Sequence, residues 1–305
     1  MSLRGASDIT NVITAVVCND QVVDGHGNSL QESRPVLWWS FTKTVLAAAA
    51  LALVRDGKLD LGAPVDDQPY TLRQLLRHTA GVPNYSDLNA YAMAVERNES
   101  PWTSDQMLEQ VRSDRLVFAP GDGWRYSNTG YLLIRQMIEN TVDADLQTSL
   151  QQLVLSPLGI DKVSVALTPE DLDETAWGNP SRYHPAWVYH GLLIGPAASA
   201  ALLLERLLTR SFLPTSLLEE MTQAIPLGDT ILGRPGINFG YGMGLMIARE
   251  GPAGPSTGHT GAGPTSVAAV YHFPDRRCTV ATFAPIRDQA IVEWAAHNAA
   301  MAHQQ

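Results

Sequence analysis

The chain has 305 residues, of which 45% are hydrophobic and 17% are charged, and its formal net charge at pH 7 is −10. This length and composition exclude an intrinsically disordered chain and predict a globular protein with one large domain or two interleaved ones. The acidic balance, without any polybasic segment, argues against nucleic acid or an anionic membrane surface as the partner.

The sequence has no stretch typical of a membrane-spanning helix. Its longest strongly apolar run, 45–54, is about half as long as a membrane span. Residues 1–17 lack the uninterrupted apolar segment of a secretory signal. The sequence as given therefore predicts a cytoplasmic protein, or a periplasmic or secreted one if a leader has been removed. Cys18 and Cys278 are too few for a disulfide framework or a metal quartet, and we expect both in the core.

The first predicted elements are a hairpin and a buried helix. Within residues 11–24, β-branched residues flank Asn19 and Asp20, a turn pair that tolerates positive φ. Residues 41–56 are apolar all round, which predicts a helix that is buried on every face. Gly57 is expected to end this helix.

The middle of the chain is predicted to be helical, with proline- and glycine-rich loops between the helices. Thr71 is expected to cap the first of these helices and Asn128 the third. The predicted helices cover residues 71–78, 104–113, 129–141, 196–211 and 215–223.

After Gly240 the hydrophobic pattern changes to the one that is typical of strands. The strand-like segments are 241–250, 265–273 and 277–286, and a helical pattern over 288–302 closes the chain. Strands at both ends with helices between them predict an α+β fold, in which an antiparallel sheet with flanking helices is built from both chain ends.

This order of elements also predicts the domain organisation. We expect residues 1–60 and 225–305 to form the sheet domain and 61–224 to form an inserted, mainly helical domain. The functional site is expected in the cleft between the two.

Three short motifs carry the functional interpretation. Ser40 and Lys43 are three residues apart at the start of the apolar helix, 126–128 is the only Tyr-x-Asn sequence, and 259–261 is His-Thr-Gly just before a predicted strand. A capping serine and a snorkelling lysine would explain the first pair alone. The three motifs together favour a catalytic site, because a set of motifs is far more specific than a single one.

With these motifs the chain resembles the serine β-lactamase and penicillin-binding-protein superfamily. It is most similar to the branch that contains class C β-lactamases, D-alanyl-D-alanine carboxypeptidases, D-aminopeptidases and β-lactamase-like esterases. The likeness extends to residues 72–85, 120–134 and 258–263, which flank the family motifs Ser-x-x-Lys, Tyr-x-Asn and Lys/His-Thr-Gly. The resemblance implies a β-lactamase/transpeptidase-like fold and a serine hydrolase without a cofactor.

The chemistry of Ser40 and Lys43 agrees with this resemblance. A serine hydroxyl is a poor nucleophile until a neighbouring base takes its proton. Residues i and i+3 share a helix face, so Lys43 can reach Ser40, and burial lowers the pKa of a lysine and so increases its free-amine fraction. At the helix start, Ser40 also has backbone N–H groups and the positive dipole end beside a developing oxyanion.

The resemblance implies roles for the other motif residues. Tyr126 would form the second half of the base with Lys43 and pass the proton to the leaving group. Asn128 would bind the acyl-side amide of the substrate, and Thr260 its leaving-group side. The amide of Ala262 would complete the oxyanion hole with the amide of the serine.

Two departures from the family pattern leave the substrate specificity open. His259 replaces the lysine of many β-lactamases, and its partial charge near neutrality predicts better binding of carboxylated substrates as the pH falls. Arg249 is an alternative cation. Trp38 and Trp39 replace smaller residues and are expected to narrow the pocket or to pack on the sheet. His190 belongs to no group with metal-ligand spacing, and we expect no metal.

The leading hypothesis is a serine hydrolase that forms an acyl-enzyme with a small amide, a D-amino-acid peptide or a carboxylic ester. Peptide or amide hydrolysis and ester hydrolysis are left open as equal alternatives, and a true β-lactamase ranks third. The alternative from another class is a penicillin-binding sensor module that acylates without turnover. The expected partner is a small-molecule or short-peptide substrate, and the sequence does not determine the oligomeric state.

Overall fold

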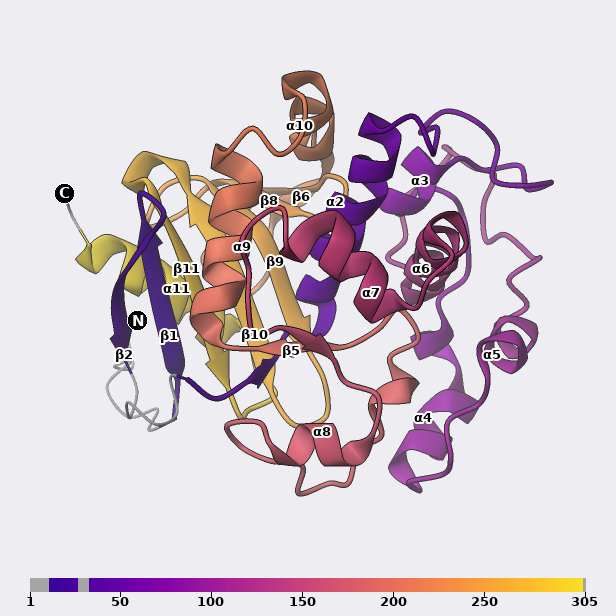
Figure 1. The fold of residues 1–305 in the computed structure, drawn as a ribbon, viewed down its shortest axis with the longest axis horizontal. Helices are drawn as coiled ribbons and strands as arrows, with labels where there is room; N and C mark the ends of the chain where they lie inside the picture. Colours follow the sequence, from indigo (N-terminus) through magenta and orange to yellow (C-terminus); the bar gives the residue numbers. More distant parts are fainter. Residues whose placement is uncertain (1–10, 27–32, 304–305) are drawn as a thin grey trace.

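The computed structural model of the protein describes residues 11–26 and 33–303. Its main feature is an eight-stranded antiparallel sheet with the strand order β2-β1-β11-β10-β9-β8-β7-β6 (Figure 1). The strands are β1 (Ile13–Cys18), β2 (Gln21–His26), β6 (Ile225–Thr230), β7 (Ile237–Tyr241), β8 (Met246–Glu250), β9 (Ser256–Ala262), β10 (Val267–Phe273) and β11 (Cys278–Ala284). The sheet thus joins the two ends of the chain, as the sequence predicts.

The N-terminal hairpin is the predicted one. Asn19 and Asp20 form its turn with φ values of 51° and 65°, in the left-handed region that asparagine and aspartate tolerate best after glycine. β1 then pairs with β11, and Cys18 lies opposite Cys278 in that register. Both cysteines are buried, as expected.

The central strands are buried on both faces. In β1, Ala15 and Val17 pack into one cluster, whereas Val16 and Cys18 pack into another, because successive strand residues point to opposite faces. Helices α2 (Thr42–Arg55) and α9 (Ala197–Thr209) contribute to the first cluster, and α11 (Gln289–Ala302) contributes to the second. The sheet is therefore sandwiched between helices.

The remaining principal helices are α3 (Leu72–Leu76), α4 (Asn89–Glu96), α5 (Ser104–Val111), α6 (Asn128–Val142), α7 (Leu146–Leu150), α8 (Pro169–Asp173) and α10 (Thr215–Thr222). In Figure 1, α3 to α7 lie on the far side of α2 from the sheet, whereas α10 lies above β6 and β8 and α8 lies below β10. Although α9 falls within the predicted helical range, it packs against β1, β10 and β11. The division into two domains remains a prediction.

A small three-stranded sheet lies beside the start of α2. It has the order β3-β5-β4 and consists of β3 (Val36–Leu37), β5 (Leu193–Gly195) and β4 (Ser164–Val165). The amide of Trp38 donates to the carbonyl of Leu193 at 2.9 Å, and its indole N–H donates to the carbonyl of Gly195 at 3.2 Å. These bonds fix the chain two residues before Ser40.

One local expectation is wrong. The side chain of Ser127, not of Asn128, caps α6 by accepting the Gly130 amide at 3.0 Å. The segment 259–261 precedes β10, the expected strand, and it also lies within β9, which the sequence analysis did not predict. Along residues 11–26 and 33–303, no helix is long and apolar enough to cross a membrane.

Candidate active site

Ser40 lies in the short 3-10 helix η1 (Trp39–Phe41), which continues directly into α2. The preceding residue, Trp39, has a φ of 46°, which is a strained conformation for a bulky side chain. The Trp39 indole N–H donates to Oγ of Ser266 at 2.8 Å, and the ring is almost wholly buried. The backbone conformation and the hydrogen bond of Trp39 thus position Ser40 at the first turn of the helix, where it is half-buried.

Lys43 lies one turn later and points back to the serine. Its Nζ is 3.1 Å from Oγ of Ser40, and its side chain is completely buried. Burial lowers the pKa of Lys43 well below its usual value, because a charged ammonium loses its water there. The structure thus places Lys43 in the buried position from which the sequence analysis expected a lowered pKa.

Tyr126 enters from the segment just before α6. Nζ of Lys43 lies 5.0 Å from the centroid of its ring. Burial raises the pKa of the Tyr126 phenol, and the neighbouring Ser40 hydroxyl lowers it by a smaller amount. His78 packs against the phenol with ring centroids 4.4 Å apart, and its Nδ1 accepts the amide of Ser127 at 3.1 Å. Burial thus favours the neutral phenol of Tyr126 and the neutral amine of Lys43.

Strand β9 approaches the serine closely through a glycine. A Cβ atom on Gly261 would lie 2.9 Å from the amide nitrogen of Ser40 and 2.6 Å from Cβ of Trp39, closer than real side chains come. The absence of a side chain at this position lets β9 pack directly on the serine segment, and Ser40 and Ala262 line the same cavity. An oxyanion hole needs two donors beside one cavity, and the backbone amides of these two residues are the candidates.

Asn128 and Thr260 belong to two different elements, α6 and β9. The Asn128 side chain donates to Oγ of Ser86 at 3.2 Å. Thr260 is buried in β9, and its Oγ1 accepts a hydrogen bond from Nη2 of Arg234 at 3.3 Å. Arg234, rather than the exposed Arg249, is therefore the arginine that reaches the His-Thr-Gly segment.

His259 is buried and faces protein groups. Its Nε2 lies 3.0 Å from the hydroxyl of Tyr241, and its Nδ1 contacts the carbonyl of Thr260. Burial and, to a smaller extent, the charge of Lys43 lower the pKa of His259 to about 3. A ring in this setting is neutral at pH 5.5 to 8, which removes the physical basis for the expected gain in carboxylate binding over that range.

A cavity of about 90 Å³ opens at Ser40. Of the predicted residues, Asn128 and Ala262 line it together with the serine, whereas Lys43, Tyr126, His259 and Thr260 do not. The remaining lining residues are Trp39, Tyr85, Tyr183, Val188, His190, Gly263 and Pro264. Trp39 therefore both packs on β9 and narrows the cavity, whereas Trp38 belongs to the core.

His190 is a contact of Lys43 that the sequence analysis missed. Its Nε2 lies 3.1 Å from Nζ of Lys43. The two residues are 147 positions apart, and no motif connects them. Only a three-dimensional structure could reveal this neighbour.

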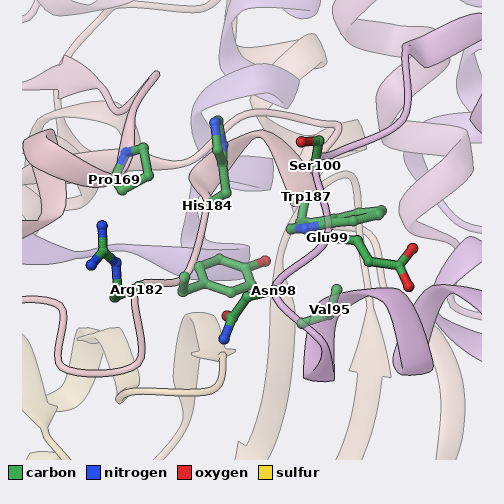
Figure 2. A pocket seen from close by; sticks show the side chains of 9 residues that line it. Val95, Asn98, Glu99, Ser100, Pro169, Arg182, His184 and Trp187 are labelled. Atoms are coloured by element: carbon green, nitrogen blue, oxygen red, sulfur yellow. The ribbon is translucent and has the colours of Figure 1, made fainter.

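A second, larger cavity of about 210 Å³ lies near the first, and Tyr183 lines both. In Figure 2, Arg182 and Glu99 lie on opposite sides of it, with Trp187 between the segments that carry them. None of the motif residues lines this cavity. Along 11–26 and 33–303, no group of three or more histidine, cysteine, aspartate or glutamate side chains could hold a metal.

Comparisons with known proteins agree with this geometry. A family model described as Beta-lactamase matches residues 3–296. Penicillin-binding protein 4* of Bacillus subtilis is 29% identical in an alignment of 154 residues that covers 46% of this chain and 33% of that protein. Esterase EstB of Burkholderia gladioli is 29% identical in an alignment of 166 residues that covers 47% of this chain and 42% of that protein. The chain thus matches less than half the length of either relative.

A solved structure extends the likeness over nearly the whole chain. The D-amino acid amidase from Ochrobactrum anthropi, in complex with L-phenylalanine, superimposes with a TM-score of 0.80 at 20% identity. The superposition covers 96% of this chain and 94% of that one. This likeness confirms the predicted β-lactamase/transpeptidase-like fold.

Proposed function

The chain belongs to the beta-lactamase family, and we propose that it is a serine hydrolase that forms an acyl-enzyme on Ser40. The observation that carries this proposal is the 3.1 Å contact between Oγ of Ser40 and Nζ of the fully buried Lys43. A lysine in this position is costly for stability, and its lowered pKa increases the fraction of free amine that can act as a base. We attribute that cost to catalysis.

The proposed reaction starts with transfer of the Ser40 proton to the amine of Lys43 while Oγ attacks the substrate carbonyl carbon. The carbonyl electron pair moves onto oxygen, where the backbone amides of Ser40 and Ala262 are the proposed donors. When the intermediate collapses, the bond to the leaving nitrogen or oxygen breaks and Tyr126 gives its phenolic proton to that atom. The proton on Lys43 then restores the phenol. Water attacks the acyl-enzyme in the same way and releases the acid.

The cavity wall favours an uncharged acyl group. No described residue that lines the 90 Å³ cavity carries a formal charge, and its walls include Trp39, Tyr183 and Val188. A free α-ammonium group would lose its water there without a carboxylate partner, which is unfavourable. We therefore propose compact esters and N-acylated D-amino acid amides as substrates. An esterase and a D-amino acid amidase among the similar proteins support cleavage of ester and amide bonds, and the uncharged cavity wall supports the N-acylated form.

Intact-mass spectrometry after incubation with three probes tests the proposal. The probes are p-nitrophenyl acetate, an N-acetylated D-alanyl peptide and benzylpenicillin. We expect a transient adduct with the ester or the peptide that maps to Ser40 and is absent in Ser40→Ala. An adduct on another serine at full stoichiometry would refute the proposal, and an adduct that never turns over would support a sensor module.

A further inference from the structure

His190 contacts the proposed general base directly. Its Nε2 lies 3.1 Å from Nζ of Lys43, the same distance that separates Nζ from Oγ of Ser40. The imidazole is only 3% exposed, and it forms part of the wall of the cavity at the serine. One lysine nitrogen therefore has two close polar neighbours, the nucleophile and this ring.

A tight turn holds His190 in this position. The amide of Gly191 donates to the carbonyl of Val188 at 2.7 Å, and the φ of Gly191 is +93°, a conformation that glycine adopts without strain. The amide of Tyr189 donates to the hydroxyl of Tyr85 at 3.3 Å. The turn is thus tied to the aromatic wall of the cavity next to the ring.

The surrounding hydrogen bonds decide which nitrogen of His190 carries the proton. The Tyr85 hydroxyl lies 3.5 Å from Nδ1, and Nζ of Lys43 faces Nε2. An unprotonated Nε2 accepts an N–H from either an amine or an ammonium group. Once Lys43 has taken the serine proton, its ammonium group has no lone pair, so a protonated Nε2 would oppose it donor to donor. The tautomer with its proton on Nδ1, facing the Tyr85 oxygen, is the one that keeps the contact throughout acylation.

We propose that His190 is a positioning residue for Lys43, an inference that rests on the proposed function. By accepting one N–H of the amine, Nε2 turns the lone pair of Nζ toward the Ser40 hydroxyl. After proton transfer the same acceptor stabilises the ammonium through a charge-assisted hydrogen bond. No proton leaves the imidazole, so the bonds that change remain those of Ser40, Lys43 and the substrate.

The imidazole remains uncharged in this role. Burial and then the charges of Lys43 and Arg135 lower the pKa of His190 well below its usual value. The other titratable or charged groups around His190 and Lys43 are Tyr85, Tyr126, Tyr131, Tyr241, His78, His259 and Arg135. Burial keeps those tyrosines and histidines neutral, and Arg135 is paired with Glu139 at 3.1 Å. The neutral-range pH dependence of acylation therefore reports on Lys43 with Tyr126.

Stopped-flow acylation by p-nitrophenyl acetate, followed as a function of pH, tests the role of His190. We expect His190→Leu to slow acylation by about tenfold or more, because the lone pair is no longer oriented. Removal of the acceptor destabilises the ammonium form of Lys43 more than its amine form, which lowers the pKa of the lysine. The acid limb of the pH profile should therefore move to lower pH by about one unit. His190→Gln places an amide oxygen near the former Nε2 position and should restore most of the rate and the acid limb. His184→Asn, in the same loop, serves as the control and should match the wild type.

A double-mutant cycle tests the tautomer without the leucine variant. Tyr85→Phe removes the partner of Nδ1 and should slow acylation in the wild-type background, but not in His190→Gln, which has no group at that position. Three results would each overturn the inference about His190 and leave the proposed function intact. They are losses that simply add in the double variant, a His190→Leu pH profile that shifts to higher pH, and wild-type kinetics in His190→Leu. A wild-type protein that is never acylated would overturn it together with the proposed function.

Discussion

The amine of Lys43 and the phenol of Tyr126 share the space beside Ser40, with Nζ 5.0 Å from the centroid of the tyrosine ring. Burial moves their pKa values in opposite directions, lowering that of the lysine and raising that of the tyrosine. Both shifts favour the state in which the proton resides on the phenol and the lone pair on the amine. We propose that the two groups act as one acid–base pair.

Because the pair acts as a unit, its variants should not be additive. We expect Lys43→Ala and Tyr126→Phe each to reduce the acylation rate by about 10³-fold or more, and the double variant to lose little beyond the worse single one. Burst kinetics with a nitrophenyl ester measure this rate. The exposed Lys58→Ala serves as the control and should match the wild type. Losses that multiply in the double variant would show separate proton paths.

The protonation state of Lys43 can be observed directly, because the chain has only two other lysines, Lys58 and Lys162. Both are exposed, whereas Lys43 is fully buried. In protein labelled with ¹³C at lysine Cε, we expect at about pH 8 one resonance at the shift of a neutral amine and two at that of ammonium groups. Lys58→Arg and Lys162→Arg assign the signals. Three ammonium shifts would rule out Lys43 as the resting base.

Much of the fold could be predicted because its elements have strong local patterns. Residues 41–56 are apolar on all sides, and the structure buries α2 from Thr42 to Leu53. The pair Asn19 and Asp20 determines a hairpin turn whatever surrounds it. The residues that form such patterns lie close together in the sequence, so the elements can be predicted without knowledge of the tertiary structure.

β9 was harder to predict because it contains glycines, which are unfavourable in strands but are needed where another chain segment approaches closely. Gly258 and Gly261 weaken the strand pattern, yet a Cβ at either position would collide with a neighbouring segment. The requirement for close packing on β10 and on Ser40 selected residues with a low strand propensity. The sequence analysis therefore assigned no element to the residues that form β9.

The candidate site was only partly predictable for a different reason. Ser40 and Lys43 are neighbours on one helix, so their contact follows from spacing alone. The contact of Lys43 with His190, and that of Thr260 with Arg234, join positions far apart in the sequence. Whether such residues meet depends on how loops pack, which no local pattern determines.

Gly261→Ala should damage the site through the backbone. The new Cβ would lie 2.9 Å from the Ser40 amide, so β9 must move away from the serine. We expect a loss of about 1–3 kcal/mol in the free energy of unfolding. We also expect a slower acylation rate than this loss of stability explains, because the proposed oxyanion donors separate. Gly130→Ala is the matched control, since its Cβ would meet nothing closer than 3.7 Å inside α6. Urea unfolding and burst kinetics measure both effects, and equal behaviour of the two variants would contradict the proposed role of the β9 contact.

The ion pair between Arg234 and Glu293 should matter for stability because both side chains are largely buried, at 14% and 3% exposure. Tyr271 also donates to the same carboxylate at 2.8 Å. Glu293→Ala leaves a guanidinium and a hydroxyl without their acceptor, and we expect it to cost about 3–5 kcal/mol of unfolding free energy in urea titrations. Glu99→Ala breaks an exposed pair and should cost at most about 1 kcal/mol. A small loss in Glu293→Ala would mean that water replaces the missing carboxylate.

His259 determines how substrate preference should respond to pH. Burial lowers its pKa to about 3, so the ring gains no proton between about pH 8 and pH 5.5 and offers no new charge to a substrate carboxylate. Protonation of the pair formed by Lys43 and Tyr126 slows carboxylated and neutral esters alike, and the ratio of their kcat/KM values cancels this shared loss. We therefore expect a flat ratio over this range, in the wild type and in His259→Gln. A ratio that rises as the pH falls in the wild type and becomes flat in His259→Gln would show that the histidine is charged in the substrate complex. The hydrogen bond between Nε2 and the Tyr241 hydroxyl would then be reversed, with the ring as donor and the phenol oxygen as acceptor.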